Sequence, residues 1–247
     1  MQSIETNAEQ KIFDHLFILP VFNEAIILRK SVESLLQFLE NNWKRNSLWS
    51  VVIADNASTD DTKRIGSALM AEHPKQVCYV RIDKKGRGNA LREIIRSFDS
   101  SYYLYSDIDI PVDFSEFLNF FSLLEGNELD IVIGKRKGRR PFARKVLTYG
   151  LRLWTRSVFQ LSFADPQSGF KAFNAKAADL ALLCREESYF FDTELLVHGA
   201  RENLRMKEVE ILWIEQRYKT RPSKVTFFKD SYKGISAMIR IFRRLNK

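Results

Sequence analysis

The sequence has little cysteine and no long apolar stretch. Its 247 residues include two cysteines, Cys78 and Cys184, which are too few for a disulfide framework and whose separation matches no zinc-ligand pattern. We therefore expect a reducing, cytoplasmic environment in which both thiols are buried as small apolar groups. No apolar run approaches the ~20 residues that a membrane-spanning helix needs, and residues 1–10 lack the apolar core of a signal peptide. We expect a chain that does not cross a membrane, although it could lie on one.

Positive charge is in excess. The formal net charge of +8 and a pI near 9.4 favour an anionic partner, which could be a nucleotide, a phosphate, an anionic lipid or a nucleic acid. The absence of internal repeats, low-complexity tracts and linkers indicates one continuous domain over residues 1–226, with functional halves at 1–112 and 113–226. Residues 227–247 form a separate basic segment. The sequence gives no indication of the oligomeric state.

In the first half of the chain, apolar runs alternate with helical patterns. We expect strands at 16–19, 49–54, 77–82 and 102–105. Leucine and valine at helical spacing over 28–39 predict the first helix. Ser58 resembles an N-cap for a helix over about 59–70, and apolar positions from Leu91 to Phe98 predict the third. Four strand–helix alternations predict an α/β fold with a mostly parallel sheet and helices on both faces.

The second half has a different order. We expect a helix around 117–124, a strand at 130–133, and then a very basic segment, 134–145, which could be a binding loop, a solvated loop or a nucleic-acid patch. Helix-like sequence at 145–160, a helix near 174–184 and a strand at 209–214 complete this half.

Polar residues follow the predicted strands of the first half. Asn23, Asp55, Lys85 and Asp107 each come directly after a strand. Because ligands of open parallel sheets bind at the carboxyl ends of the strands, these four positions predict one binding site.

The Asp107-Ile108-Asp109 pair ends the fourth strand and has two interpretations. Two acids after a strand are common in plain turns. They also suit a hard cation, Mg²⁺ or Mn²⁺, which is held by one or two carboxylates and completed by substrate phosphates. The preceding basic loop, DKKGRGNALR at 83–92, opens a helix and is suited to phosphate.

These motifs together resemble the inverting family-2 glycosyltransferases, which have the GT-A fold. The matching stretches are LPVFNEA at 19–25, DNASTD at 55–60, the K-G-x-G loop at 85–88 and the D-x-D pair. In the second half, VIGKRKG at 132–138, DPQSGFKAF at 165–173, FFDTELL at 190–196 and RPSKV at 221–225 are similar to the branch that glucosylates or mannosylates polyprenyl (dolichyl) phosphate. The resemblance covers nearly the whole chain.

The resemblance implies roles for particular residues. The donor, UDP-glucose or GDP-mannose, would lie against Pro20, Asn23, Glu24, Asp55, Asn56, Lys85, Gly86 and Asp107. The metal would be held by Asp107 and Asp109, and the catalytic set would be Asp109, Asp192 and Arg136. The phosphate of the polyprenyl acceptor or of the donor would be gripped by Arg136, Arg144, Lys145, Gln167, Ser168, Lys171, Ser223 and Lys224.

One position departs from the family pattern. Many members have a glutamine two residues after the second aspartate, where this chain has Pro111, so the metal would be completed by Asp192 or by water. A phosphate acceptor is already ionised at neutral pH and needs no strong base, whereas a hydroxyl acceptor would need Asp192 or Glu194 as general base.

Two alternatives to a polyprenyl-phosphate transferase stay open. One is a GT-A transferase acting on a saccharide, protein or other lipid hydroxyl. The other is a non-enzymatic module on the same fold that binds nucleic acid or regulates a partner, although we do not expect nucleic acid as the partner.

The last 21 residues alternate basic and apolar side chains. Ile239 and Phe242 fall on one side of a helical wheel, and Arg240 and Arg244 on another. This pattern predicts a helix that lies in the surface of an anionic membrane on its cytoplasmic face, or one that packs on the domain with its basic residues in water.

Overall fold

A seven-stranded sheet runs through the part of the chain that the computed structural model describes, which is residues 11–44, 46–126, 128–137, 156, 158–159, 161–213 and 236–244. Its order is β3-β2-β1-β4-β6-β5-β7. The strands are β1 (Lys11–Val21), β2 (Trp49–Asn56), β3 (Val77–Ile82), β4 (Phe98–Ser106), β5 (Ile131–Lys137), β6 (Phe170–Asn174) and β7 (Met206–Leu212). β6 is antiparallel to both of its neighbours, and the other four pairings are parallel. The predicted mostly parallel sheet is confirmed.

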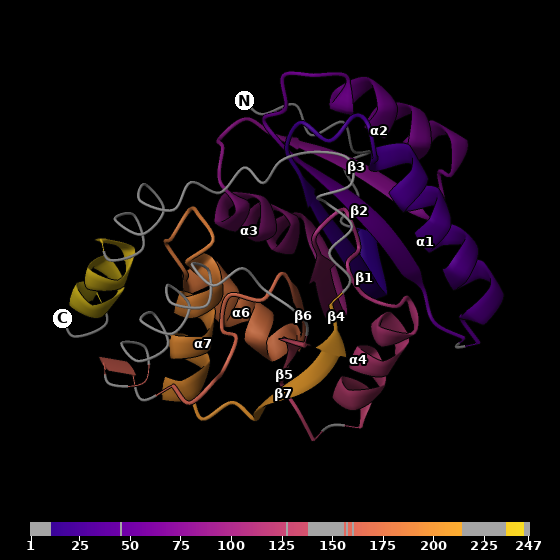
Figure 1. Ribbon diagram of the computed structural model, residues 1–247. Coiled ribbons are helices and arrows are strands. Elements are labelled where there is room, and N and C mark those ends of the chain that lie inside the picture. The colour runs from indigo at the N-terminus through magenta and orange to yellow at the C-terminus, as the bar shows by residue number, and fades with distance from the viewer. Residues whose placement is uncertain are drawn as a thin grey trace.

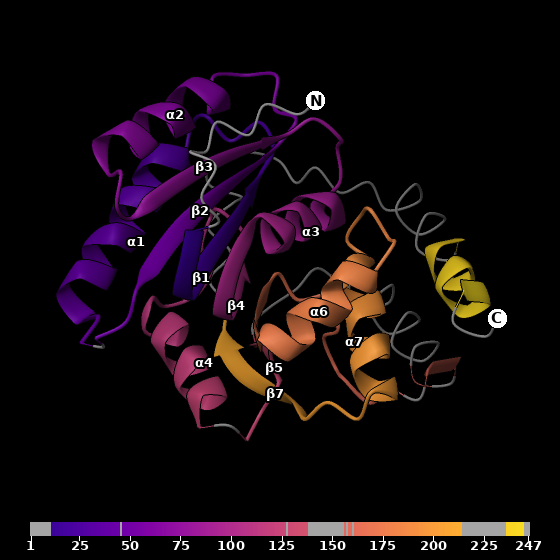
Figure 2. The ribbon, with the colours of Figure 1, turned by 180° about the vertical axis from the view of Figure 1, so that it is seen from behind.

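Helices cover both faces of this sheet (Figures 1 and 2). One face carries α3 (Arg87–Ser97), α6 (Ala175–Leu183) and α7 (Phe191–Arg201), and the other carries α1 (Leu28–Asn42), α2 (Thr62–Glu72) and α4 (Ser115–Glu125). Along β1, Leu16 and Ile18 enter the first core while Phe17 and Leu19 enter the second. A strand buried on both faces requires such a continuous apolar run.

Several predicted boundaries were wrong. α2 begins at Thr62 rather than near 59, because the Ser58 hydroxyl accepts a hydrogen bond from the backbone of Asn23 instead of capping a helix. Phe98 is the first residue of β4, not part of the helix before it. The predicted strand at 209–214 is β7, which covers 206–212.

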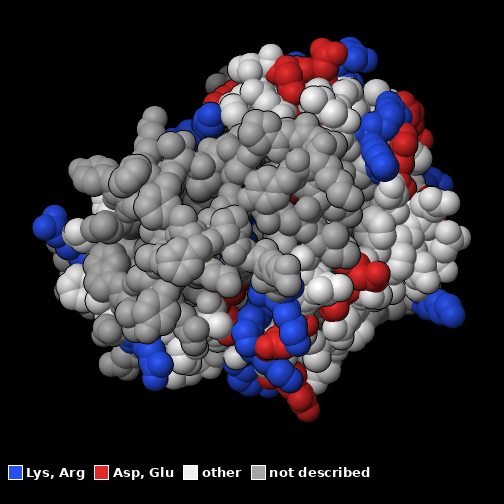
Figure 3. All heavy atoms as spheres, in the orientation of Figure 1, with Lys and Arg blue, Asp and Glu red and all other residues white. Residues whose placement is uncertain are grey.

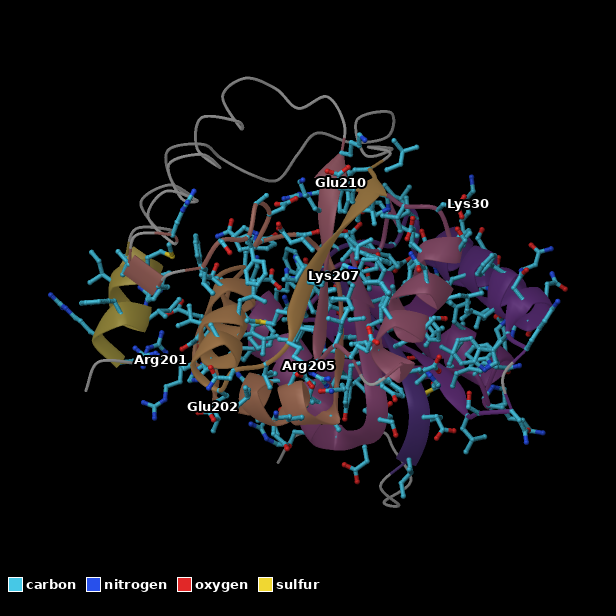
Figure 4. The ribbon with its side chains drawn as sticks, turned by 90° about the horizontal axis from the view of Figure 1, so that it is seen from below. Lys30, Arg201, Glu202, Arg205, Lys207 and Glu210 are labelled. Atoms are coloured by element: carbon cyan, nitrogen blue, oxygen red, sulfur yellow. The ribbon has the colours of Figure 1, made fainter. Side chains whose placement is uncertain are left out.

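Strand β5 is longer than expected, and this changes the interpretation of the basic segment at 134–145. Residues 134–137 continue the strand and pair with β7, so the first part of the 134–145 segment is sheet rather than loop. Lys135 and Lys137 both form ion pairs with Glu210. Figure 4 places Arg205 and Glu210 at opposite ends of β7, with Glu210 toward the carboxyl end. Residues 138–145 lie outside the described residues.

The surface over α1 and α2 carries both charges side by side (Figure 3). Arg29 pairs with Glu72 at 2.6 Å and with Glu33 at 2.9 Å, and Arg64 pairs with Asp61 at 2.8 Å. The net positive charge of the chain therefore does not form a cationic patch there.

The helix at 236–244 (yellow in Figure 1) packs on the domain. It buries Ala237, Met238 and Ile241 against Phe190, whereas Phe242 keeps 44% of its surface exposed. Within the described ranges, no helix has both the length and the apolar character to span a membrane. The predicted boundary at residue 226 lies outside the described residues.

Candidate active site

The loops that follow β1 and β2 are hydrogen-bonded into one unit. Asn23 has a φ of +54°, a conformation that asparagine tolerates better than most residues. Its backbone N–H donates to Ser58 Oγ at 2.9 Å, and its Oδ1 accepts from the backbone of Thr59 at 2.7 Å. The backbone of Glu24 donates to Thr62 Oγ1 at 2.9 Å. The LPVFNEA and DNASTD stretches thus lie together, as the sequence suggested.

Asp55 anchors the second loop from inside. Its side chain is fully buried, and its two oxygens accept from the backbone of Ser58 at 2.9 Å, from the Tyr79 hydroxyl at 2.5 Å and from Arg81 at 3.2 Å. Burial and the neighbouring carboxylate raise the pKa of Tyr79. In the adjacent strand, Pro20 pairs with Ala54, just before Asp55.

The glycine loop before α3 is tied to the second loop. Asn56 Oδ1 accepts from the backbone of Gly86 at 2.7 Å. Gly86 has a φ of +147°, and a Cβ there would meet the Glu187 carbonyl at 2.3 Å, so both backbone and packing require glycine. The Lys85 ammonium lies 3.7 Å from the centroid of the Phe22 ring. This loop therefore carries a cation at the same edge of the sheet.

Arg87, which sequence reasoning left without a role, joins the glycine loop to the D-x-D turn. Its side chain is 10% exposed, and its Nη1 lies 3.5 Å from Asp107 Oδ1 and 3.9 Å from Asp192 Oδ2. Burial alone would lower the pKa of Arg87, but the charges of Asp192 and Asp107 raise it. Within the described part of the chain its buried Nε and Nη2 have no hydrogen-bond partner. The planar guanidinium therefore keeps N–H donors that can bind a further acceptor.

The D-x-D turn is a strained piece of backbone held by its apolar residues. Ile110, directly before Pro111, has a φ of +37°, which for a β-branched residue is a true outlier and costs of the order of 1–3 kcal/mol. Ile108 and Ile110 are buried in the core, 3% and 6% exposed, whereas Asp107 and Asp109 are half-buried. The turn therefore presents both carboxylates on the side away from the core.

Gly169, in the DPQSGFKAF stretch, packs directly against Asp107. The Asp107 backbone donates to the Gly169 carbonyl at 3.2 Å. A Cβ at residue 169 would lie 2.5 Å from Asp107 Oδ2, closer than real contacts allow. Glycine is needed here for the close approach of the carboxylate.

A buried polar cluster lies behind the turn. Lys171 is fully buried; its Nζ donates to the Ser168 carbonyl at 2.6 Å and lies 3.4 Å from Asp192 Oδ1. The Tyr105 hydroxyl donates to Asp192, which is 1% exposed. Burial lowers the pKa of Lys171 and, with the charge of Asp192, raises that of Tyr105. The predicted site residues Lys171, Ser168 and Asp192 thus support the site from inside rather than line its surface.

Arg136 is engaged by a carboxylate. Its Nε and Nη2 donate to the two oxygens of Asp165 at 2.6 and 2.7 Å, and its guanidinium lies 5.1 Å from the Trp213 ring centroid. Burial alone would lower the pKa of Arg136, but the bonds to Asp165 and its charge raise it. Gln167 is half-buried in the same loop.

Four predicted phosphate-binding residues, Arg144, Lys145, Ser223 and Lys224, lie outside the described residues.

Asp107 and Asp109 are the residues that could hold a metal. Over the described ranges no cluster of three or more His, Cys, Asp or Glu side chains has the arrangement of a metal site. Two carboxylates at one turn nevertheless fit Mg²⁺ or Mn²⁺, which commonly take the rest of their ligands from substrate phosphates and water. Arg87 Nη1 pairs with both Asp107 and Asp192, so the Arg87 guanidinium lies between Asp192 and the D-x-D turn.

The fold and the site together define a class of protein. Four loops at the carboxyl edge of a mostly parallel sheet bring a glycine-containing basic loop, an acidic D-x-D turn and two hydrogen-bonded polar motifs to one place. This is the architecture of the GT-A transferases that use nucleotide-diphospho-sugars. The chain belongs to glycosyl transferase family 2, whose family model matches residues 16–160.

Known proteins of this kind are similar over most of the chain. A dolichyl-phosphate beta-glucosyltransferase of Dictyostelium discoideum is 27% identical over 80% of this chain and 65% of its own length. An undecaprenyl-phosphate mannosyltransferase of Micrococcus luteus is 26% identical over 81% of this chain and 84% of its own length. The crystal structure of glucosyl-3-phosphoglycerate synthase from Mycobacterium tuberculosis with Mn²⁺, UDP and glucosyl-3-phosphoglycerate superposes with a TM-score of 0.67 at 18% identity, covering 93% of this chain and 80% of that one.

The first of these relatives is longer than this chain, which spans slightly less than two thirds of its length. The structural similarity, at 18% identity, confirms the GT-A fold.

Proposed function

We propose that the chain transfers one hexose, glucose or mannose, from a nucleotide-diphospho-sugar to the phosphate of a polyprenyl phosphate. The observation that carries the proposal is the state of the two candidate bases. Asp192 is buried and accepts from Tyr105, while Glu194 is buried and accepts from the backbones of Arg185 and Glu186 at 2.8 and 2.7 Å. Neither is placed to take a proton from a hydroxyl acceptor.

A phosphate acceptor removes the need for that proton transfer. A phosphate monoester is ionised at neutral pH, since its second pKa is near 6, so it can attack the anomeric carbon directly. The enzyme then has to orient two anions against each other and exclude water. The names of the Dictyostelium and Micrococcus relatives, which act on dolichyl and undecaprenyl phosphates, support this acceptor class.

The D-x-D turn would bind the donor diphosphate through a metal ion. Asp107 and Asp109 would hold Mg²⁺ or Mn²⁺, which when bound neutralises the charge of the departing diphosphate. Arg87 would hold Asp107 in place and turn its unpaired donors toward phosphate oxygens. The Asn23, Asp55 and Lys85 loops would receive the nucleotide.

We also propose that the chain works at the cytoplasmic face of a membrane. The support is the exposed apolar pair on the helix at 236–244, where Ile239 is 38% and Phe242 44% exposed, and the two cysteines, which are both buried and form no disulfide. Interfacial helices present apolar and basic side chains in this way.

The test incubates the purified full chain with radiolabelled UDP-glucose or GDP-mannose, a short polyprenyl phosphate and Mg²⁺ or Mn²⁺. We expect radiolabel in the organic phase, lost on addition of EDTA and in Asp109→Ala. Label on a soluble saccharide would favour the hydroxyl-acceptor alternative. A chain that only binds anions would keep or gain affinity in Asp109→Ala because a negative charge is removed.

A further inference from the structure

A groove of about 900 Å³ lies between the glycine loop, residues 185–189 and the helix at 236–244. We call it the helix groove. Six of its lining side chains are cationic: Lys85, Arg87, Arg185, Arg240, Arg243 and Arg244. Two are acidic, Glu186 and Glu187. No residue of the DPQSGFKAF stretch lines the groove, whereas Asn56, Lys85 and Gly86 do, so the groove borders the proposed donor site.

The acids of the helix groove are already neutralised. Glu186 accepts from Arg240 at 2.8 and 3.0 Å and also pairs with Arg244, and Glu187 pairs with Lys84. Over the described ranges, no ion pair involves Lys85, Arg185 or Arg243. The groove therefore keeps a net positive charge and attracts an anion.

The walls of the helix groove are held in place. Glu194 accepts the backbone N–H groups of Arg185 and Glu186, and the Gly88 backbone donates to the Glu187 carbonyl at 2.8 Å. The helix at 236–244 is fixed through Glu186 and through its buried apolar side. Fixed walls make this a formed site, because an anion need not order them on binding.

Exposed apolar side chains lie beside these cations. Tyr189, which lines the groove, is 57% exposed, and Ile239 and Phe242 neighbour Arg240 and Arg243 on the same helix. A nucleotide could stack its base on a ring such as Tyr189, but it has no hydrocarbon to cover the exposed apolar side of the helix. An amphiphile with a phosphate head and a hydrocarbon chain uses both parts.

We infer that the helix groove binds the phosphate of the lipid-linked acceptor through Arg185 and Arg243, with Arg87, beside Asp107, at the inner end where the groove meets the proposed donor diphosphate. The isoprenoid chain leaves over Tyr189 and the exposed side of the helix. This inference rests on the proposed function, since it names the place where the acceptor of that reaction binds. It makes the C-terminal helix part of the acceptor site.

The test compares the wild-type full chain with the double variant Arg185→Gln/Arg243→Gln, and uses Arg64→Gln as matched control because Arg64 lies on α2 and is 73% exposed. Both substituted arginines are exposed, so the variant should unfold at the wild-type temperature. Binding of a short, soluble polyprenyl phosphate is measured without donor. Charge-assisted contacts of this kind predict a loss of about ten- to a hundredfold, and a matching rise in acceptor KM with donor KM within about twofold.

Three results would overturn the inference. One is unchanged binding of polyprenyl phosphate by the double variant. Another is a rise in donor KM alone, which would mean that the groove binds the nucleotide. The third is a loss of binding to phosphatidylglycerol vesicles, compared with phosphatidylcholine vesicles, without a loss of polyprenyl phosphate binding. That result would mean that the groove binds membrane phospholipid. If the wild type binds polyprenyl phosphate through these arginines but transfers no hexose, the proposed function fails and the groove assignment stands.

Discussion

Replacing Gly169 with alanine should disable the site while leaving the fold intact. The new Cβ would lie 2.5, 2.7 and 2.8 Å from three atoms of the Asp107 carboxylate, where ordinary contact begins at 3.4 Å. The shortfall, 3.4 minus 2.5, is 0.9 Å, so the carboxylate has to move by about that distance. Asp107 is 28% exposed and can swing toward solvent, so we expect a stability loss of only about 1 kcal/mol.

The catalytic effect should be much larger. A misplacement of about 1 Å at a reacting centre costs roughly 10²-fold in rate, and here the displaced group is a proposed ligand of the metal and neighbour of the diphosphate. We expect kcat for hexose transfer to fall by about that factor, and more Mg²⁺ or Mn²⁺ to be needed for half-maximal rate. The assay measures lipid-linked radiolabel against metal concentration, with thermal unfolding recorded on the same preparation.

Gly126 provides the matched control. It ends α4 with a φ of −64°, and a Cβ there would find its nearest atom, the Ser122 carbonyl oxygen, at 3.8 Å. Gly126→Ala should therefore keep wild-type turnover and stability within about 0.5 kcal/mol. Wild-type turnover and metal dependence in Gly169→Ala would refute the placement of Asp107 described above.

Three further variants test other parts of the structure. Burial lowers the pKa of His198 below 6.5, so the unfolded chain binds more protons below that pH and the free energy of unfolding falls on acidification. Urea midpoints measured at pH 7, 6 and 5 should therefore fall less in His198→Gln than in the wild type. An equal fall in both proteins would contradict this. Asp165→Ala leaves the largely buried Arg136 without its partner and should cost about 3–5 kcal/mol, whereas a midpoint close to wild type would mean that the pair is dispensable. Ile239→Ser/Phe242→Ser should float less with anionic liposomes than wild type at unchanged melting temperature; equal flotation would remove the membrane role of this helix.

The sequence predicted the first half of the fold well because its strands are buried on both faces. Continuous apolar runs such as the one around Phe17 leave little ambiguity about where a strand lies. The start of α2 was missed because a polar side chain has a tertiary partner. Ser58 has the local appearance of a helix cap, but its hydroxyl is used by Asn23 from another loop, and spacing along the chain carries no information about that.

The second half was harder to read for a similar reason. β6 is a five-residue strand inside a stretch that has the appearance of a motif, and it is inserted antiparallel between β4 and β5. In the site, the positions of Asp55, Lys85 and Asp107 followed from the strand ends, whereas Arg87 was missed. The one available signal was an arginine between two glycines at a helix start, and its importance appears only when Asp107 and Asp192 are brought beside it.

The most direct measurement of the central claim is the anomeric configuration of the product. The full chain is incubated with an α-linked nucleotide hexose, a short polyprenyl phosphate and Mg²⁺, and the lipid fraction is examined by proton NMR. A single inverting displacement by the acceptor phosphate predicts one hexose in β linkage to that phosphate. An α-linked product, or hexose found only on a hydroxyl acceptor, would contradict it.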